Sequence, residues 1–287
     1  MSASESSNTP NEQIKVPEAL DFEQESLALA EHVKPLTDDE LAAPTAFKQW
    51  RLNDIFAHLH FFNLMAHYSL VDETRFAAEI KKLYDRMGAG QTMVQATDEL
   101  LDGLSGRPLI EAWQETVGSM TPHWAGADPR QRLNWVGPTM SVRSSISARL
   151  METWAHGQAI YDLMGLERTN TDRIRSVVVM GVNTFGWTFK NRDEPIPESP
   201  PQVRLTSPSG AQWLFHEGAP AENSIQGSAE DFCQVVTQVR HVTDTDLIVT
   251  GPIANAWMNQ AQCFAGKPND PPAPGTRFKA KQPWPER

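Results

Sequence analysis

The chain has 287 residues, of which 40% are hydrophobic and 21% are charged, and its formal net charge is −11. This length fits one large domain or two of ordinary size, and the composition is that of a soluble globular protein. The acidic balance argues against nucleic acid or an anionic membrane as the main partner, and no stretch approaches the roughly 18 apolar residues of a membrane span. Because residues 1–15 lack the apolar core of a signal peptide, we expect a cytoplasmic protein.

The first half of the chain shows mainly helical periodicity. Residues 1–16 are polar and predict a disordered tail. We then expect two helices, one ending near Pro35 and one that starts at Asn53 as N-cap and bends or continues near Val71. Residues 91–103 are ambiguous. Three further segments have the pattern of helices, and they are 108–117, the site helix 138–164 and 172–189.

The pattern changes at Asn191, where four prolines between residues 195 and 201 predict a connector. The next segments predict short strands around a turn, then a helix, a strand and a closing helix; they are 203–205, 212–215, 228–239, 247–249 and 253–264. The two cysteines, Cys233 and Cys263, match no disulfide framework or zinc knuckle, so we expect buried structural thiols. The tryptophans Trp154, Trp187 and Trp213 are expected to pack in the core.

One constellation suggests chemistry. Glu152 and His156 are four residues apart, so on a helix their side chains leave from the same face. A carboxylate and an imidazole placed this way form half of a metal site, and His58 on another helix could supply the third ligand and leave positions open. The alternatives are an exposed hydrogen-bonded pair and a core histidine at position 58. His60 and His67, seven residues apart, form a rival face on the same helix.

Two motifs resemble a known family. WRLNDIFAHL at residues 50–59 and RLMETWAHGQ at residues 149–158 resemble the two signatures of the maleylpyruvate isomerase-like branch of the DinB-type metal-binding bundles. The resemblance implies a four-helix bundle that holds a divalent metal through His58, Glu152 and His156. Zinc is the expected ion, with nickel and iron as alternatives. The family pattern has an acidic residue three positions after the last ligand, where this chain has Ala159, with Asp162 further on.

The resemblance extends to about residue 268. Residues 231–233, 236–241 and 262–266 look like the C-terminal domain of an uncharacterised subgroup of this family, a domain similar to sterol-carrier-protein-like folds. The expected fold class is therefore α+β, a DinB-like four-helix bundle followed by a smaller mixed α/β domain. The expected divisions are a disordered tail, the bundle, the α/β domain and a Pro-rich tail on the surface, at residues 1–16, 17–190, 191–267 and 268–287.

Characterised members of the family use a low-molecular-weight thiol such as mycothiol, bacillithiol or glutathione. By resemblance we expect a metal-dependent isomerase or S-transferase that acts on a small anionic substrate, with Arg149 and Arg240 as candidate catalytic cations. Arg143 and His241 are weaker candidates, and Arg240 could instead form a surface salt bridge. Two alternatives stay open: a hydrolase that activates water, and a non-enzymatic protein that binds metal and lipid. His123 is expected in a loop, and the oligomeric state is open, with a homodimer as one option.

Overall fold

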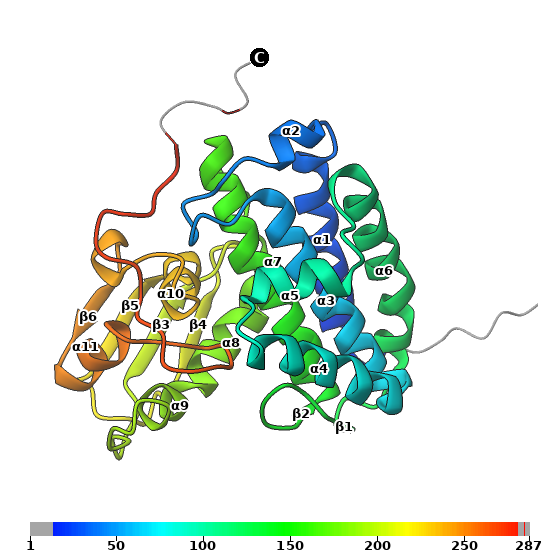
Figure 1. Ribbon diagram of the computed structural model, residues 1–287. Coiled ribbons are helices and arrows are strands. Elements are labelled where there is room, and N and C mark those ends of the chain that lie inside the picture. The colour runs from blue at the N-terminus through cyan, green and yellow to red at the C-terminus, as the bar shows by residue number, and fades with distance from the viewer. Residues whose placement is uncertain (1–13, 281–283, 285–287) are drawn as a thin grey trace, which may run out of the picture.

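The computed structural model describes residues 14–280 and residue 284. Figure 1 shows a bundle of long helices beside a smaller part that contains a four-stranded sheet. This arrangement confirms the α+β fold class expected from the sequence. Most of the predicted disordered tail lies outside the described residues, but Lys15 and Val16 are already tied to the bundle because their backbone N–H groups donate to the carbonyl of Ala125.

Four long helices form the bundle, and each packs against two of the others in the order α1, α6, α3, α7 and back to α1. Their bounds are α1 (Glu18–Val33), α3 (Leu52–Val71), α6 (Gly106–Gly126) and α7 (Val142–Met164). The centre of the bundle is filled by large side chains that are fully buried, among them Phe22, Phe56, Trp113, Trp124 and Trp154. Burial of this much aromatic surface fixes the helices against one another, which the position of a shared site requires.

The start of α3 differs from the prediction by two residues. The N-cap is Arg51, and Asp54 provides the capping carboxylate by accepting the Arg51 backbone N–H at 2.8 Å. The Arg51 guanidinium also donates to Asp54, at 2.7 Å. Asn53, expected as the cap, instead uses its side-chain oxygen to accept the backbone N–H of Gly106 at the start of α6. Both residues of the cap, Arg51 and Asp54, therefore belong to the motif WRLNDIFAHL at residues 50–59.

Helix α3 ends at Val71, and Asp72 separates it from α4 (Glu73–Gly88). Asp72 is the C-cap of α3 and the N-cap of α4, where its carboxylate accepts the backbone N–H of Arg75 at 3.0 Å. The ambiguous segment at residues 91–103 contains α5 (Met93–Leu100), and both α4 and α5 pack on α3. A short helix, α2 (Asp38–Leu41), lies between α1 and α3.

The segment before the site helix was only partly predicted. Helix α6 continues through Pro122 to Gly126, so His123 is helical and the expected loop position is wrong. A short hairpin of β1 (Arg132–Leu133) and β2 (Met140–Ser141) follows, and α7 starts at Val142 instead of residue 138. Ser141 caps α7 by accepting the backbone N–H of Ser144 at 3.1 Å, and Gly165, with φ of 66°, ends it as predicted.

The smaller part is joined to the bundle through the region predicted as one helix at residues 172–189. That region is divided into a 3₁₀ turn (Asp172–Ile174), α8 (Arg175–Asn183) and α9 (Phe185–Lys190). The break falls at Thr184, whose hydroxyl donates to the carbonyl of Met180 at 2.8 Å. Helix α8 packs against α7 on one side and against α10 (Ala229–Val236) on the other, so it links the two parts.

The sheet has the strand order β4–β3–β5–β6, with β3 parallel to β5 and the other pairs antiparallel. Its strands are β3 (Gln202–Thr206), β4 (Gln212–Phe215), β5 (Ser224–Ser228) and β6 (Ile248–Thr250). Val203, Leu205 and Ile225 point into the core, where α10 packs against β3 and β5. Strand β5 was missed because Ile225 is its one strongly β-forming residue, and its parallel pairing with β3 provides the structure.

Two predicted helices in this part are shorter than expected. Helix α10 ends at Val236 because Gln238 adopts a left-handed conformation, with φ of 58°. Its N-cap is Ser228, as predicted, and the Ser228 hydroxyl accepts the backbone N–H of Asp231. Helix α11 (Pro252–Met258) stops before Cys263, whose backbone N–H donates to the carbonyl of Val236 at 3.0 Å. A second 3₁₀ turn (Val242–Asp244) lies between α10 and β6.

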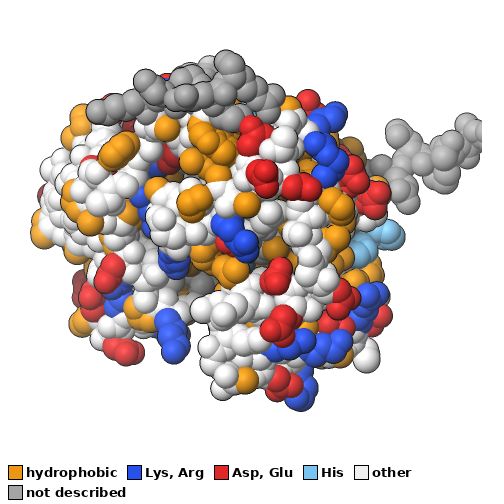
Figure 2. Space-filling view, turned by 45° about the horizontal axis from the view of Figure 1, so that its top comes forward, with side chains coloured by type: hydrophobic (Ala, Val, Ile, Leu, Met, Phe, Trp, Pro, Cys, Tyr) orange, Lys and Arg blue, Asp and Glu red, His pale blue; other side chains and the backbone are white. Residues whose placement is uncertain are grey.

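The distribution of charged side chains on the surface agrees with the acidic net charge of −11. On the face drawn in Figure 2, Lys and Arg side chains are interspersed with Asp and Glu side chains, and the part not covered in grey carries no continuous basic patch. Among the described residues, none forms a helix that is both long enough and apolar enough to cross a bilayer.

Candidate metal centre

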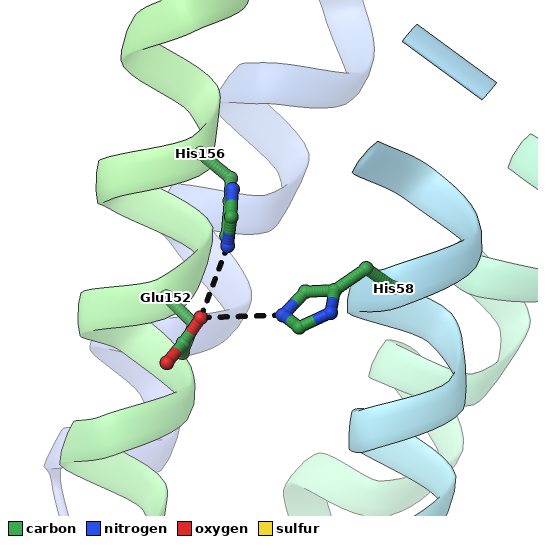
Figure 3. Close-up of side chains that lie close together, drawn as sticks. All are labelled: His58, Glu152 and His156. Atoms are coloured by element: carbon green, nitrogen blue, oxygen red, sulfur yellow. Dashed lines mark hydrogen bonds and ion pairs between the residues drawn. The ribbon is translucent and has the colours of Figure 1, made fainter. Parts of the chain in front are cut away.

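Two helices of the bundle bring the three predicted ligands together. His58 lies in the second turn of α3, Glu152 and His156 lie one turn apart on α7, and the two helices pack against each other. The Nε2 atoms of both histidines face the same carboxylate oxygen, Oε2 of Glu152, at 3.4 Å from His58 and 3.2 Å from His156 (Figure 3). One ligand atom from each residue lies within 4.8 Å of the others, and no other such group of three is found among the described residues.

The environment holds His58 and Glu152 in the forms that bind metals. Burial lowers the pKa of His58 to about 4, so its imidazole is neutral at neutral pH. Burial alone would raise the pKa of Glu152, but hydrogen bonds with His156 and His58 hold it well below its usual range. A neutral imidazole and an ionised carboxylate are the states required for coordination. The donor set therefore fits a divalent cation.

Aromatic rings surround the two histidines. The Trp50 ring is parallel to the His156 ring at a centroid distance of 5.7 Å, and the Phe47 ring meets His156 edge-on at 5.0 Å. Phe62, one turn after His58 on α3, lies 4.7 Å from the His58 ring. These contacts restrict the orientation of both imidazoles, and a fixed orientation favours a preformed site.

The loop that carries Phe47 and Trp50 has a constrained backbone. Pro44 pairs with Arg51 across its base, while Lys48 and Gln49 both have left-handed φ values, 50° and 59°. Two consecutive residues other than glycine in this region are unusual and are found where surrounding contacts hold them. Here Thr45 provides such contacts: its hydroxyl donates to the Trp50 carbonyl at 2.9 Å and accepts the Phe47 backbone N–H at 3.2 Å.

A cavity of about 420 Å³ opens over the three residues. Its walls come from α7, from the loop with Phe47 and Trp50, from residues 237–240 after α10, and from the C-terminal segment. His58, Glu152 and His156 all line it. The volume suits a small molecule, and the three donors reach it from the bundle side.

Arg240 lies in the cavity wall, as the sequence predicted it could. Its guanidinium binds the Asp162 carboxylate with two hydrogen bonds, at 2.7 and 2.6 Å, and both side chains are about nine-tenths buried. Asp162 also accepts from the Gln158 amide at 3.0 Å. Asp162 and Ala159 both line the cavity. Ala159 stands where the family pattern has an acidic residue, and the nearby acid of this chain, Asp162, is bound by Arg240.

Arg149 is differently placed. Its side chain is buried, its Nε donates to the Asn63 side chain at 3.1 Å, and it does not line the cavity. Burial lowers the pKa of Arg149 to about 10, so the group remains cationic at neutral pH. It interacts electrostatically with Glu152, but no ion pair joins the two side chains. Arg149 can influence the site through its charge without touching a ligand in the cavity.

The remaining candidates lie elsewhere. His60 is buried outside the cavity, and the rings of His67 and His123 contact each other in a tilted arrangement, with their centroids 5.3 Å apart. His241 caps the second 3₁₀ turn, and Arg143 forms an ion pair with Glu18 at 3.0 Å.

Both cysteines are free and buried, as predicted, and burial raises the pKa of both thiols. Neither lines the cavity. Trp154 and Trp213 are buried packing residues, while Trp187 is half-buried and donates to the Phe264 carbonyl at 3.3 Å.

Comparison with known proteins agrees with the two motifs. Residues 22–161, which include all three candidate ligands, match the model of the mycothiol maleylpyruvate isomerase N-terminal domain. The chain is also 35% identical over 252 residues to the uncharacterized proteins MT0041 and Rv0036c of Mycobacterium tuberculosis, strains CDC 1551 / Oshkosh and H37Rv. These alignments cover 88% of this chain and 96% of each relative. The chain belongs to the maleylpyruvate isomerase-like family.

Solved structures of a mycothiol-dependent maleylpyruvate isomerase and of a mutant of it are also similar to this member of the family. The TM-score is 0.47 for both, with 13% and 12% sequence identity, over 76% of this chain and 86% of each solved chain.

The sequence did not indicate two side chains that the argument below uses. Phe47 and Arg277 line the cavity, but neither belongs to a motif or to a periodic pattern that would have indicated this.

Proposed function

We propose that this protein is a metal-dependent enzyme that uses a low-molecular-weight thiol in isomerase or S-transferase chemistry on a small anionic substrate. The observation that carries the proposal is the convergence of His58, Glu152 and His156 on the floor of a cavity of about 420 Å³. We propose these three residues as the ligands of the ion, with zinc as the first choice and nickel or iron as alternatives. A bound divalent ion would act as a Lewis acid and lower the pKa of a thiol that reaches it.

The residues of the chain would prepare this site. Glu152 would supply a negative charge that partly neutralises a divalent ion, while His58 and His156 would supply nitrogen donors. The Trp50 and Phe47 rings cover His156 and reduce its contact with water. A drier site strengthens every electrostatic interaction made within it.

The position of the cysteines supports a thiol that comes from solution. Cys233 and Cys263 are buried, burial raises the pKa of both, and neither lines the cavity. A thiol with a raised pKa that has no access to the substrate is a poor nucleophile. The name of the matched family model points to mycothiol, and the chemistry is equally compatible with glutathione or another small thiol.

Cobalt substitution tests the proposal directly, because thiolate coordination to Co²⁺ gives an intense charge-transfer absorption band. We expect this band to appear when mycothiol or glutathione is titrated into the Co²⁺-loaded protein, and we expect no band with Glu152→Ala. His60→Ala, which removes a buried histidine of the same helix outside the cavity, is the matched control and should behave as wild type. A Co²⁺-loaded wild-type protein that shows no band with any small thiol would refute the thiol-dependent function. Turnover without a thiol would favour the hydrolase alternative.

A further inference from the structure

The C-terminal segment forms one wall of the cavity. The sequence predicts a surface tail from residue 268, and much of this segment is exposed, but its backbone is attached to both parts of the molecule. The backbone N–H of Gly275 donates to the Asp244 carboxylate at 2.9 Å, and the backbone N–H of Ala280 donates to the Asp162 carbonyl at 2.7 Å. Between these two attachments, Arg277 reaches into the cavity wall.

The carboxylates that line the cavity already have partners. Glu152 is paired with the two histidines, and Asp162 is held by Arg240 through two hydrogen bonds. Asp270, at the exposed edge, forms an ion pair with Arg192 at 2.9 Å. None of these three carboxylates forms an ion pair with a further cation of the cavity, although Asp162 is near enough to interact electrostatically with Arg277.

Three cations of the cavity have no such carboxylate partner. Lys48 and Lys267 lie at the exposed rim, and Arg277 is half-buried further in. No ion pair joins any of the three to a described acidic residue. A cavity with an excess of positive charge in a chain of net charge −11 is a local feature that favours an anion.

The geometry of Arg277 gives this excess charge a direction. Its guanidinium lies 5.1 Å from the centroid of the Phe47 ring, and Phe47 in turn contacts the His156 ring edge-on. Its Nη1 donates to the Gln238 carbonyl at 3.0 Å, while Nε and Nη2 make no hydrogen bond to a described residue. These two atoms form the side of a guanidinium that binds a carboxylate with two parallel hydrogen bonds. One phenyl ring separates this fork from a candidate metal ligand.

We propose that Arg277 binds the carboxylate of a small ligand whose other end reaches the metal centre, and that it thereby selects anionic over neutral ligands. Arg240 is occupied by Asp162 and holds the wall in place. The inference deepens the proposed function and rests on it for the position of the reacting group. The carboxylate can belong to the substrate or to the thiol cofactor.

Two pairs of probes separate these sources. The first compares 3-mercaptopropionate with 2-mercaptoethanol, which are thiols with and without a carboxylate, and the second compares succinate with its neutral diamide. Affinities are measured by titration calorimetry on the Zn²⁺-loaded full chain. Only the anionic member of each pair can form two charge-assisted hydrogen bonds with the Arg277 guanidinium. We therefore expect the anionic member of at least one pair to bind about tenfold tighter or more than the neutral member. A preference confined to the thiol pair assigns the carboxylate to the cofactor, and one in the succinate pair assigns it to the substrate.

Variants tie the preference to the residue. Arg277→Gln should abolish it, and Arg277→Lys, which keeps the charge but not the fork, should retain part of it. Lys279→Gln is the matched control, because Lys279 lies on the same segment, pairs with Glu167 outside the cavity and carries the same charge. No preference in either pair, or a preference unchanged in Arg277→Gln, would overturn the inference. The failure of the proposed function is distinguishable from the failure of the inference. If succinate binds more tightly than its diamide, Arg277→Gln abolishes this preference, and no thiol gives a Co²⁺ band, then the proposed function is refuted and the inference stands.

Discussion

Removal of the Arg240 guanidinium should destabilise the protein by about 3 kcal/mol, because it leaves the Asp162 carboxylate buried without its cation. The two side chains are 10% and 9% exposed and are joined by hydrogen bonds of 2.6 and 2.7 Å. Breaking a buried ion pair from one side costs about 3–5 kcal/mol. Asp162 would keep the hydrogen bond from Gln158 at 3.0 Å, which places the expected loss at the lower end of that range.

Urea unfolding of four proteins measures this loss: wild type, Arg240→Ala, Asp162→Asn and the double variant. Because the second change removes the group that the first left unpaired, the double variant should lose less stability than the sum of the single losses. Lys81→Ala is the control, since Lys81 and Asp85 form an ion pair at 2.6 Å with side chains 75% and 62% exposed, and it should change stability by less than about 1 kcal/mol. An Arg240→Ala loss as small as that of the control, or strictly additive losses, would show that water solvates the pair and would refute the reasoning.

Three further predictions concern packing, acid stability and thiol reactivity. A Cβ atom at Gly181 would lie 2.8 Å from Val236, so Gly181→Leu should separate α8 from α10 and lower the free energy of unfolding by about 1–3 kcal/mol or more, measured in urea. Burial would raise the pKa of Glu25, but two arginines lower it below its ordinary 4.5, so the stability that ionised Glu25 contributes is present above pH 4.5 and lost as the pH falls. Glu25→Gln should therefore weaken the fall of the melting temperature between pH 6 and 2. A fall as steep as that of wild type would contradict the assignment. Cys233 and Cys263 should not react with a thiol reagent in the native protein and should react fully in denaturant; rapid native labelling would contradict their burial.

The parts of the structure that depend on local sequence could be predicted. The site helix, its end at Gly165 and the shared face of Glu152 and His156 follow from helical spacing and capping alone. His58 lies 94 residues from Glu152 in sequence, so spacing gave no information on that contact. The family motif indicated it, and the packing of α3 on α7 provides it.

The parts that depend on contacts between distant segments could not be predicted. Strand β5 has little intrinsic preference for a strand and forms through its pairing with β3. Pro122 indicated a loop at His123, but the helix continues because the buried α6 face packs against α1 and α3. Arg277 belongs to a Pro-rich segment without periodicity. Its place in the cavity follows from its own hydrogen bond to the Gln238 carbonyl and from the backbone hydrogen bonds of Gly275 and Ala280 on either side of it.

The metal content of the purified, untagged protein is the measurement that tests the central claim most directly. Wild type, His58→Ala, Glu152→Ala and His156→Ala would be compared by elemental analysis after reconstitution with Zn²⁺, with His60→Ala as the control. We predict about one ion per chain in wild type and in the control, and a large loss in each of the three ligand variants. A wild-type chain that takes up no metal, or ligand variants that retain it in full, would contradict the assignment of these residues as a metal centre.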